Sequence, residues 1–320
     1  NISSYCRTDS LVDIGGVLGG TKFIRKSNYR NSQGYLDPSD FWDFGFRVAF
    51  QTEQSFGSGS GPVQEILSKW KDNKKTFRYI TRHRLSHPTL PFVVDVSTVK
   101  DSKMAGKQYV PEYTFRDSGV LDSVETYEIE IEVVNTAVGL GTPYSSAELL
   151  GMALRKMIKL VLSGIQRTNY PTSRDERQQV GEEYMTLLWG KPEKGKNTNV
   201  SRGRRITPRN FVGPQGMPAQ AQNIARVNDD AAIPNVRVDY TVTDKADGER
   251  KLLFVNPMGR IYLIDTNMNF QFTGAISRVD SLFNTLMDGE HILHNKTNEF
   301  INVYAAFDLY YLKGKDMRNL

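Results

Sequence analysis

A lysine amine beside a turn is the first group in this sequence that could take part in covalent chemistry. It stands in Lys-Ala-Asp-Gly-Glu-Arg, residues 245–250, between two apolar alternating runs, so the motif is predicted to lie at a turn between strands. A lysine becomes a nucleophile only when its ordinary pKa of ~10.4 is lowered by burial or by nearby cations. Arg250 and Lys251 could supply such cations. The alternative is that Asp247 and Gly248 simply form a hairpin turn between charged flanks.

Three glutamates on one strand are the second chemically notable feature. Residues 127–132 read Tyr-Glu-Ile-Glu-Ile-Glu, and the alternation of a strand places Glu128, Glu130 and Glu132 on one face. Their charges repel one another unless a divalent cation or a cluster of arginines and lysines lies opposite. Mg²⁺ and Mn²⁺ prefer carboxylate oxygens and bridge them to phosphates, so the strand could hold a metal for phosphoryl chemistry. The alternative is a solvent-exposed strand face.

Basic residues recur on strands that precede these glutamates. Three arginines share one face of a predicted strand at residues 76–85: Arg78, Arg82 and Arg84. Arg47 and Glu53 are predicted to share one face of a strand near residue 50. Charges concentrated on one face of several strands indicate a barrel with a polar interior.

The elements that carry these residues begin with a region that is mostly sheet. Aromatic and β-branched runs separated by turn residues predict strands at residues 44–51, 76–85, 92–100 and 127–134. Between the first two, residues 63–70 have the apolar spacing of one helix face. The pattern changes after residue 135, where an apolar stripe of period 3.6 predicts a helix up to residue 165, and a second helix is predicted at 174–189.

A polar, basic stretch at residues 191–209 then separates two parts of the chain. It predicts one domain at residues 1–195 and a second at 196–320. Strands return in the second part, at residues 236–243, 251–256, 260–265 and 300–308, with a hairpin turn at 256–259. The predicted fold class is therefore α+β.

Composition limits the kinds of protein that this can be. The 41 Lys and Arg against 36 Asp and Glu give a net charge of +5, which suits a polyanionic partner. A single cysteine, Cys6, excludes an intramolecular disulfide framework and favours a reducing, cytoplasmic compartment. No apolar run reaches the length of about 18 residues that a membrane span needs, so no membrane is expected. The chain does not begin with Met, and we expect it to be part of a longer protein.

The glutamate strand resembles that of the triphosphate tunnel metalloenzyme type of RNA 5′-triphosphatase, as do the preceding segments at residues 75–78 and 94–100. The resemblance implies an eight-stranded antiparallel barrel, with Mg²⁺ or Mn²⁺ held between two glutamate strands. Glu128, Glu130 and Glu132 match the second of these strands. The residues expected to grip the triphosphate are Arg47, Arg78, Arg82, Arg84 and Lys100, although strict alternation turns Lys100 to the opposite face. The first glutamate of the chain is Glu53, so the first Glu-x-Glu strand is expected upstream of residue 1, and this stretch in isolation is expected to be inactive.

The lysine motif has two companions downstream: Leu-Met-Asp-Gly-Glu-His-Ile at residues 286–292 and a strand-like segment at 300–308. In this order and spacing the three resemble motifs I, III and IIIa of the covalent nucleotidyltransferases, which include mRNA guanylyltransferases and ATP-dependent polynucleotide ligases. The resemblance implies that Lys245 attacks the α-phosphate of GTP and carries GMP as a phosphoramidate. The remaining residues of the implied nucleotide site are Asp247, Gly248, Arg250, Glu290 and Phe307, the last stacking on the base.

Together the two resemblances indicate a viral-type multifunctional mRNA-capping enzyme, which removes the γ-phosphate of an RNA 5′ end and then adds GMP. The expected partners are GTP, the 5′ end of nascent mRNA, and a viral RNA polymerase or methyltransferase domain, in the host cytoplasm or the virion. Motifs IV and V and an OB-fold domain should follow residue 320, so these residues alone are not expected to complete the reaction. Two alternatives stay open: an ATP-dependent polynucleotide ligase, and a non-catalytic scaffold with degenerate versions of both folds.

Three further observations complete the sequence-based expectations. Residues 211–215 resemble a segment that precedes the lysine motif in viral capping guanylyltransferases. The four histidines form no metal-ligand pattern, and His291 and His294 are expected to flank a turn. Asp288 is likewise interpreted as a turn residue.

Overall fold

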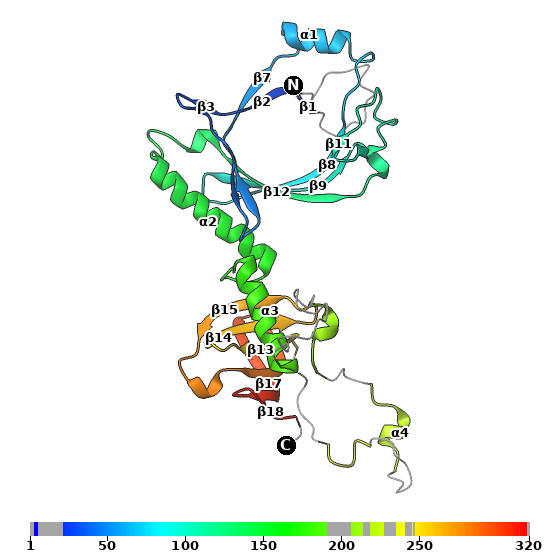
Figure 1. Ribbon diagram of the computed structural model, residues 1–320, viewed down its shortest axis with the longest axis vertical. Helices are drawn as coiled ribbons and strands as arrows, with labels where there is room; N and C mark the ends of the chain where they lie inside the picture. The colour runs from blue at the N-terminus through cyan, green and yellow to red at the C-terminus, as the bar shows by residue number, and fades with distance from the viewer. Residues whose placement is uncertain are drawn as a thin grey trace, which may run out of the picture. The chain divides into compact units, whose positions relative to one another are not determined.

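The computed structural model describes residues 3–5, 22–190, 206–213, 218–226, 235–240, 245 and 247–318, with only the backbone of 3–5. The chain forms two compact units, Asn1–Val161 and Leu162–Leu320 (Figure 1). Helices and antiparallel sheets occur in both, which confirms the mixed α and β class. The division falls inside a helix rather than at the predicted boundary after residue 195. None of the described helices is long and apolar enough to span a membrane.

Two three-stranded antiparallel sheets dominate the first unit, in the orders β1-β2-β7 and β12-β9-β8. Figure 1 shows them on opposite sides of the unit. Their strands are β1 (Ser3–Tyr5), β2 (Lys22–Asn28), β7 (Gln51–Phe56), β8 (Arg78–Ser86), β9 (Phe92–Asp101) and β12 (Thr126–Val133). The smaller pairs are β3 (Arg30–Asn31) with β4 (Gly34–Tyr35), β5 (Ser39–Phe41) with β6 (Phe46–Val48), and β10 (Met104–Ala105) with β11 (Gln108–Tyr109). The helices are α1 (Gly61–Ser68) and α2 (Ala147–Gln166).

The β12-β9-β8 sheet has one apolar and one charged face because its side chains alternate. Phe92 and Val94 of β9 pack with Ala153 and Met157 of α2, and Ile131 of β12 joins them. Leu150, Leu154, Met157 and Val161 of the predicted apolar stripe of α2 are therefore confirmed as the face that covers this sheet, whereas Ile165 is exposed. The opposite face carries the arginines and glutamates that the sequence singled out.

The predicted eight-stranded barrel is not shown by the described strands, which form separate hydrogen-bonded sheets. The strand predicted at residues 44–51 is split between β6 and β7, which belong to different sheets. The prediction that Arg47 and Glu53 share a strand face is therefore wrong. Arg47 lies on the β5–β6 hairpin, where it pairs with Asp40 at 2.6 Å.

One six-stranded antiparallel sheet forms the second unit, in the order β15-β14-β13-β16-β17-β18. Its strands are β13 (Glu249–Val255), β14 (Arg260–Asp265), β15 (Phe270–Ile276), β16 (Thr285–His294), β17 (Phe300–Leu312) and β18 (Lys315–Asp316). The strands predicted near residues 251 and 260 are confirmed, and β17 extends beyond its predicted end. Residues 236–240 form a turn and a bend instead of the predicted strand, whose residues 241–244 lie outside the described part.

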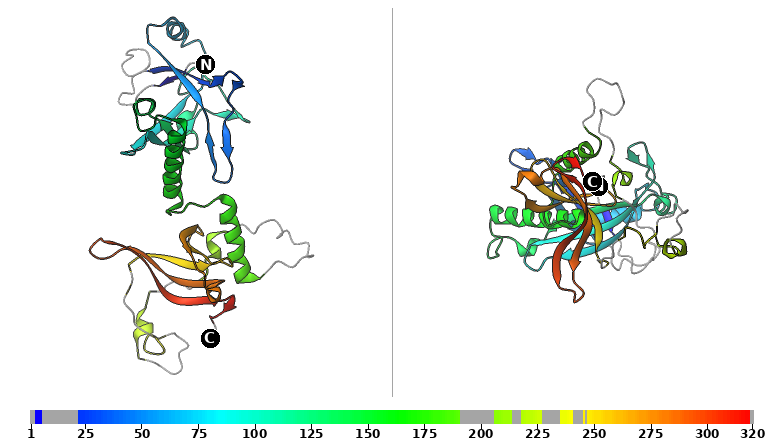
Figure 2. Two further views of the ribbon diagram at one scale, coloured as in Figure 1. Left: turned by 90° about the vertical axis from the view of Figure 1, so that its left-hand side faces the viewer. Right: turned by 90° about the horizontal axis from the view of Figure 1, so that it is seen from below.

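Helix α3 (Arg174–Trp189) covers one face of this sheet, as Figure 2 shows. It begins at Ser173, whose hydroxyl accepts a hydrogen bond from the Glu176 amide at 3.1 Å, and it ends before Gly190 at φ 75°. Val180 and the fully buried Tyr184 pack against Leu252, Phe254 and other apolar side chains of the sheet. This packing explains why α3 belongs to the second unit. The polar stretch that was predicted as the boundary comes after α3 and lies largely outside the described residues.

Candidate active site

Lys245 lies in the turn before β13, with 83% of its side chain exposed. Its Nζ contacts Asp247 Oδ1 at 2.9 Å, and this hydrogen bond raises the pKa of Lys245 above its ordinary value. The sequence-based expectation of a pKa lowered by Arg250 and Lys251 is therefore wrong for this state. Arg250 is paired with Asp288, and the Lys251 amine is directed to Glu249 and Gln271 instead.

Arg250 and Glu290 lie directly opposite each other on β13 and β16. Paired residues of adjacent strands project to the same side of a sheet, so the two side chains share a face. Glu290 Oε2 is buried and has no hydrogen-bond partner in the part of the chain that the structure describes. A buried carboxylate oxygen without a donor is costly, and it is the kind of group that a ligand hydroxyl or a metal ion satisfies.

Phe307 occupies an irregular position on β17. Asp288 pairs with Asp308 and Gly289 pairs with Ala306, so Phe307 is the extra residue of a β-bulge. Phe307 is 59% exposed and lies on the part of β17 that does not pair with β18. A bulge commonly redirects a side chain near a functional site, and an exposed aromatic face can stack on a base.

The two glycines of the motifs permit close contact between strands. A Cβ atom on Gly248 would lie 2.7 Å from the His291 carbonyl oxygen, and one on Gly289 would lie 2.5 Å from that of Ala305. Neither position has room for a side chain, so these glycines draw the lysine turn, β16 and β17 together. Asp-Gly in both motifs therefore serves strand packing, which a simple hairpin turn would not require.

Residues 196–320 match the family described as "mRNA capping enzyme, catalytic domain". This match contains the lysine turn, β16 and β17, and it covers less than half of the chain. The predicted resemblance to capping enzymes is thereby confirmed for this part.

The chain is also similar to the "Probable mRNA-capping enzyme" of Acanthamoeba polyphaga mimivirus, with 29% identity over 225 residues. That similarity spans 70% of this chain but 15% of the viral protein, so the chain corresponds to a small part of its relative. Since 225 residues exceed the length of residues 196–320, the similarity reaches into the first part of the chain. No solved structure matches the chain.

A second polar site lies in the first unit, on the charged face of the β12-β9-β8 sheet. Each arginine of β8 reaches across β9 to a glutamate of β12. Arg78 contacts Glu128 at 2.7 Å, Arg82 contacts Glu130 at 2.8 Å, and Arg84 contacts Glu132 at 3.1 Å. Of the two candidates considered for the side opposite the glutamates, a divalent cation or a basic cluster, arginines lie there in this state.

Asp95, which the sequence-based reasoning missed as a site residue, lies at the centre of this charged face. Its side chain is fully buried, and it accepts hydrogen bonds from Arg82 at 2.8 Å and from Arg84 at 2.6 and 2.7 Å. The bond from Arg84 is the main cause that lowers the pKa of Asp95. The sequence did contain a signal for Asp95, because the alternation of β9 places it on the same face as the polar Ser97.

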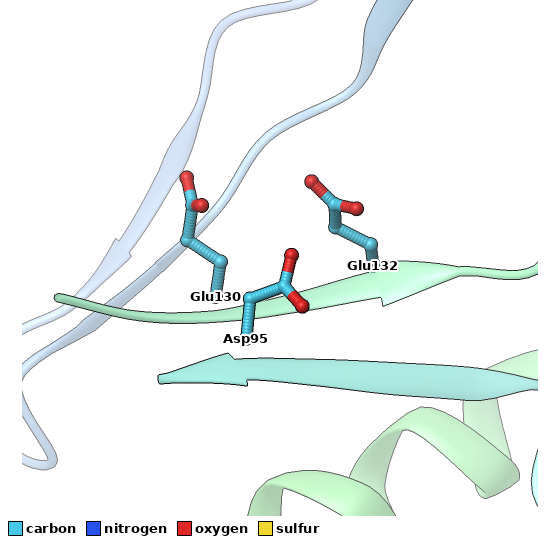
Figure 3. Close-up of side chains that lie close together, drawn as sticks. All are labelled: Asp95, Glu130 and Glu132. Atoms are coloured by element: carbon cyan, nitrogen blue, oxygen red, sulfur yellow. The ribbon is translucent and has the colours of Figure 1, made fainter. Parts of the chain in front are cut away.

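The charged face also has carboxylates suited to a divalent cation. Asp95, Glu130 and Glu132 each offer an oxygen within 4.8 Å of the others, and Figure 3 shows the three side chains on the side of the sheet away from a helix. With Glu128 and Asp101, five carboxylates face three guanidiniums, so negative charge is in excess. This donor set fits Mg²⁺ or Mn²⁺, which prefer oxygen ligands.

Two predicted phosphate grips do not join this face. The Lys100 Nζ donates to the Leu121 carbonyl at 3.0 Å and lies 3.7 Å from Glu125, on the side to which alternation turns it. Arg47 is paired on the β5–β6 hairpin. The structure therefore gathers Arg78, Arg82 and Arg84 with the three glutamates, and it leaves Arg47 and Lys100 elsewhere.

Three residues of the second unit were also misinterpreted from the sequence. Asp288 is fully buried within β16 and bonds Arg250, so it is not a turn residue. His291 and His294 belong to the same strand, so no turn lies between them, and His294 ends that strand just before the turn at residues 296–297. The Asp-Gly pair inside β16 resembles a turn signal, and only the pairing with β13 and β17 shows that the strand continues through it.

Proposed function

We propose that the second unit transfers GMP in the capping of mRNA, with Lys245 as the nucleotide acceptor. The observation that carries this proposal is the placement of Arg250 directly opposite Glu290 on adjacent strands, within the residues that match the capping-enzyme catalytic domain, where the buried Glu290 Oε2 has no partner among the described residues. Glu290 also lies close enough to Lys245 to raise its pKa electrostatically. Three groups suited to a nucleotide are thus gathered at one end of β13.

In this proposal the Lys245 amine first loses its proton and then attacks the α-phosphorus of GTP. A nitrogen–phosphorus bond forms while the bond from that phosphorus to the pyrophosphate oxygen breaks. An oxygen of a diphosphate RNA end then attacks the same phosphorus, and the nitrogen–phosphorus bond breaks to free the lysine. Arg250 and Glu290 hold the ribose and phosphate, Phe307 stacks on the base, and Asp247 and Gly248 shape the turn. Mg²⁺ or Mn²⁺ would offset the charge of the departing pyrophosphate.

Labelled nucleotides distinguish this proposal from a polynucleotide ligase, which uses the same lysine with ATP. The intact protein is incubated with α-labelled GTP or ATP and a divalent cation, and labelled protein is detected after denaturation. We expect label from GTP that is lost in Lys245→Ala. Label from ATP alone would identify a ligase, and no label from either nucleotide would favour a non-catalytic scaffold.

For the first unit we propose binding of the RNA 5′-triphosphate, as the first step of the same capping pathway. The supporting observation is the charged face itself, where guanidiniums suited to phosphate lie among carboxylates suited to Mg²⁺ or Mn²⁺. A bound triphosphate would take over the arginines from the glutamates, which would then be free to hold the cation.

Calorimetry with inorganic tripolyphosphate and Mn²⁺ tests this second proposal. Arg82→Ala and Arg84→Ala are expected to weaken binding at least tenfold, whereas Arg116→Ala, an exposed arginine of the same unit, leaves it unchanged. Equal affinity in all four proteins would remove the charged face as the binding site.

A further inference from the structure

A buried polar cluster lies beneath the proposed nucleotide site, formed by Arg250, Asp288 and Tyr310. We propose that Asp288 is a positioning residue that holds the Arg250 guanidinium away from Glu290, so that both side chains remain available to the nucleotide. The inference rests on the proposed GMP transfer. It assigns a role to a residue that is expected to touch neither nucleotide nor RNA.

Arg250 has two carboxylates within its reach. Glu290 is its direct cross-strand neighbour, and Asp288 is the next residue on the same face of β16. The guanidinium pairs with Asp288 in a two-pronged contact, Nε to Oδ1 at 3.2 Å and Nη2 to Oδ2 at 2.5 Å. A two-pronged arginine–carboxylate pair is both stronger and more directional than a single contact. Glu290 Oε2 consequently has no partner among the described residues.

The surroundings fix Asp288 in this role. Its side chain is fully buried, and Oδ2 also accepts a hydrogen bond from the Tyr310 hydroxyl at 2.6 Å. A buried carboxylate is tolerated only when it is fully paired, so Asp288 cannot turn toward a ligand without losing its partners. The Arg250 side chain keeps 25% of its surface exposed. Arg250 is therefore the member of the cluster that can meet a nucleotide.

Gly213 covers the cluster from the segment that precedes the lysine motif. Its φ is +129°, and a Cβ atom there would lie 2.6 Å from Arg250 Nη2, 2.8 Å from the Tyr310 hydroxyl and 2.9 Å from Asp288 Oδ2. The ring of Phe211, two residues earlier, lies 5.5 Å from the guanidinium carbon. Gly213 therefore lies against all three members of the cluster, and it limits the directions in which Arg250 can move.

A double-mutant cycle separates positioning from a general contribution to folding. Rates of lysyl-GMP formation are measured over a range of GTP concentrations for the intact wild type, Asp288→Asn, Arg250→Gln and the double variant. Asp288→Asn is expected to lower kcat/KM for GTP about 100-fold, since a misplacement of about 1 Å can cost that much. When Asp288→Asn is added to Arg250→Gln, it should lower kcat/KM for GTP by less than about twofold. Independent, multiplying losses would overturn the inference.

Tyr310→Phe keeps the inference testable if Asp288→Asn folds poorly, because it removes a single hydrogen bond to Asp288. Its kcat/KM should fall about tenfold while its melting temperature stays near that of the wild type. Asp316→Asn is the matched control, because Asp316 of β18 also pairs with an arginine, Arg318, at 2.5 Å. The kinetics of this variant should equal those of the wild type. If the wild type forms the adduct and both Asp288→Asn and Tyr310→Phe form it at the wild-type rate, only this inference fails. If the wild type forms no adduct, the proposed function fails with it.

Discussion

At the scale of single residues, the contact between Lys245 and Asp247 sets the state of the proposed nucleophile. The hydrogen bond to Asp247 raises the pKa of Lys245, so the amine is a cation near neutral pH. A cation attracts the triphosphate of GTP, but only the neutral amine can attack phosphorus. In the proposed reaction, Lys245 must therefore be released from Asp247 before the covalent bond forms.

This contact predicts a characteristic pH dependence. While the pH is below the raised pKa, the neutral fraction of Lys245 grows about tenfold per pH unit, so adduct formation at saturating GTP should accelerate into the alkaline range. Asp247→Asn removes the main cause of the raised pKa, and the rate should level off at a lower pH, whatever its absolute value. Asp280→Asn, another exposed aspartate of the unit, should keep the wild-type profile. Identical profiles for wild type and Asp247→Asn would contradict this account.

The sequence could predict proposed site residues that lie close together within one motif. It could not predict contacts that depend on the register between two strands. Lys245, Arg250 and Glu290 belong to short motifs whose chemistry is local. Asp288 was misinterpreted because its pairing depends on the alignment of β13 with β16, which no local pattern reveals. The raised pKa of Lys245 was missed although its main cause, the hydrogen bond to Asp247, lies within the same short motif.

At the scale of elements, close strand contact at Gly289 supports the bulge that presents Phe307. A Cβ atom at Gly289 would lie 2.5 Å from a backbone oxygen of β17, so Gly289→Ala must push the two strands apart. We expect Gly289→Ala to lose about 2 kcal/mol of stability and about 5 °C in melting temperature, measured by thermal unfolding. Gly164→Ala, in the helix α2 with no atom close to its added methyl group, is expected to unfold at the wild-type temperature or slightly above it. An unchanged melting temperature for Gly289→Ala would refute the packing argument.

The charged sheet face makes a prediction about acid stability. Hydrogen bonds from Arg84 and Arg82 lower the pKa of Asp95, so the stabilisation is present above the unfolded pKa of about 4 and is lost as the pH falls through the lower folded value. Asp95→Asn should therefore lower the free energy of unfolding by about 2 kcal/mol at pH 7, as measured by urea unfolding. On acidification the variant should lose less stability than the wild type. Glu128→Gln, at a more exposed ion pair, should cost less than about 1 kcal/mol. Equal stabilities of the two variants at pH 7 would argue against a central role of Asp95.

Helices and strands with a clear periodic pattern of apolar residues could be predicted from the sequence. Strands that form only through pairing with neighbouring strands could not. The apolar stripe of α2 and the strands β9, β12 and β14 follow directly from spacing and composition. β15 and β16 were not predicted, and for β16 the reason is its Asp-Gly pair, which locally indicates a turn. The strand predicted at residues 44–51 failed because Phe44 and Phe46 belong to the short β5–β6 hairpin, where Phe44 is 37% exposed.

At the scale of the whole molecule, two units with separate cores carry the two proposed phosphate-directed sites. The first core lies between α2 and the β12-β9-β8 sheet, and the second lies between α3 and the six-stranded sheet. The sequence predicted two domains, but contacts assign α3 to the second, because its apolar face complements the sheet that follows it. The match to the capping-enzyme catalytic domain covers residues 196–320, so the proposed role of the first unit depends on its charged face.

Peptide mapping of the GMP adduct tests the central claim most directly. The intact protein is treated with GTP and Mg²⁺ or Mn²⁺ in the presence of pyrophosphatase, digested at a pH that preserves phosphoramidates, and examined by mass spectrometry. We predict GMP on the peptide that contains Lys245, and none in Lys245→Arg, which keeps the charge but supplies a far weaker nucleophile. GMP on another lysine, or an adduct that persists in Lys245→Arg, would contradict the assignment of Lys245 as the nucleotide acceptor.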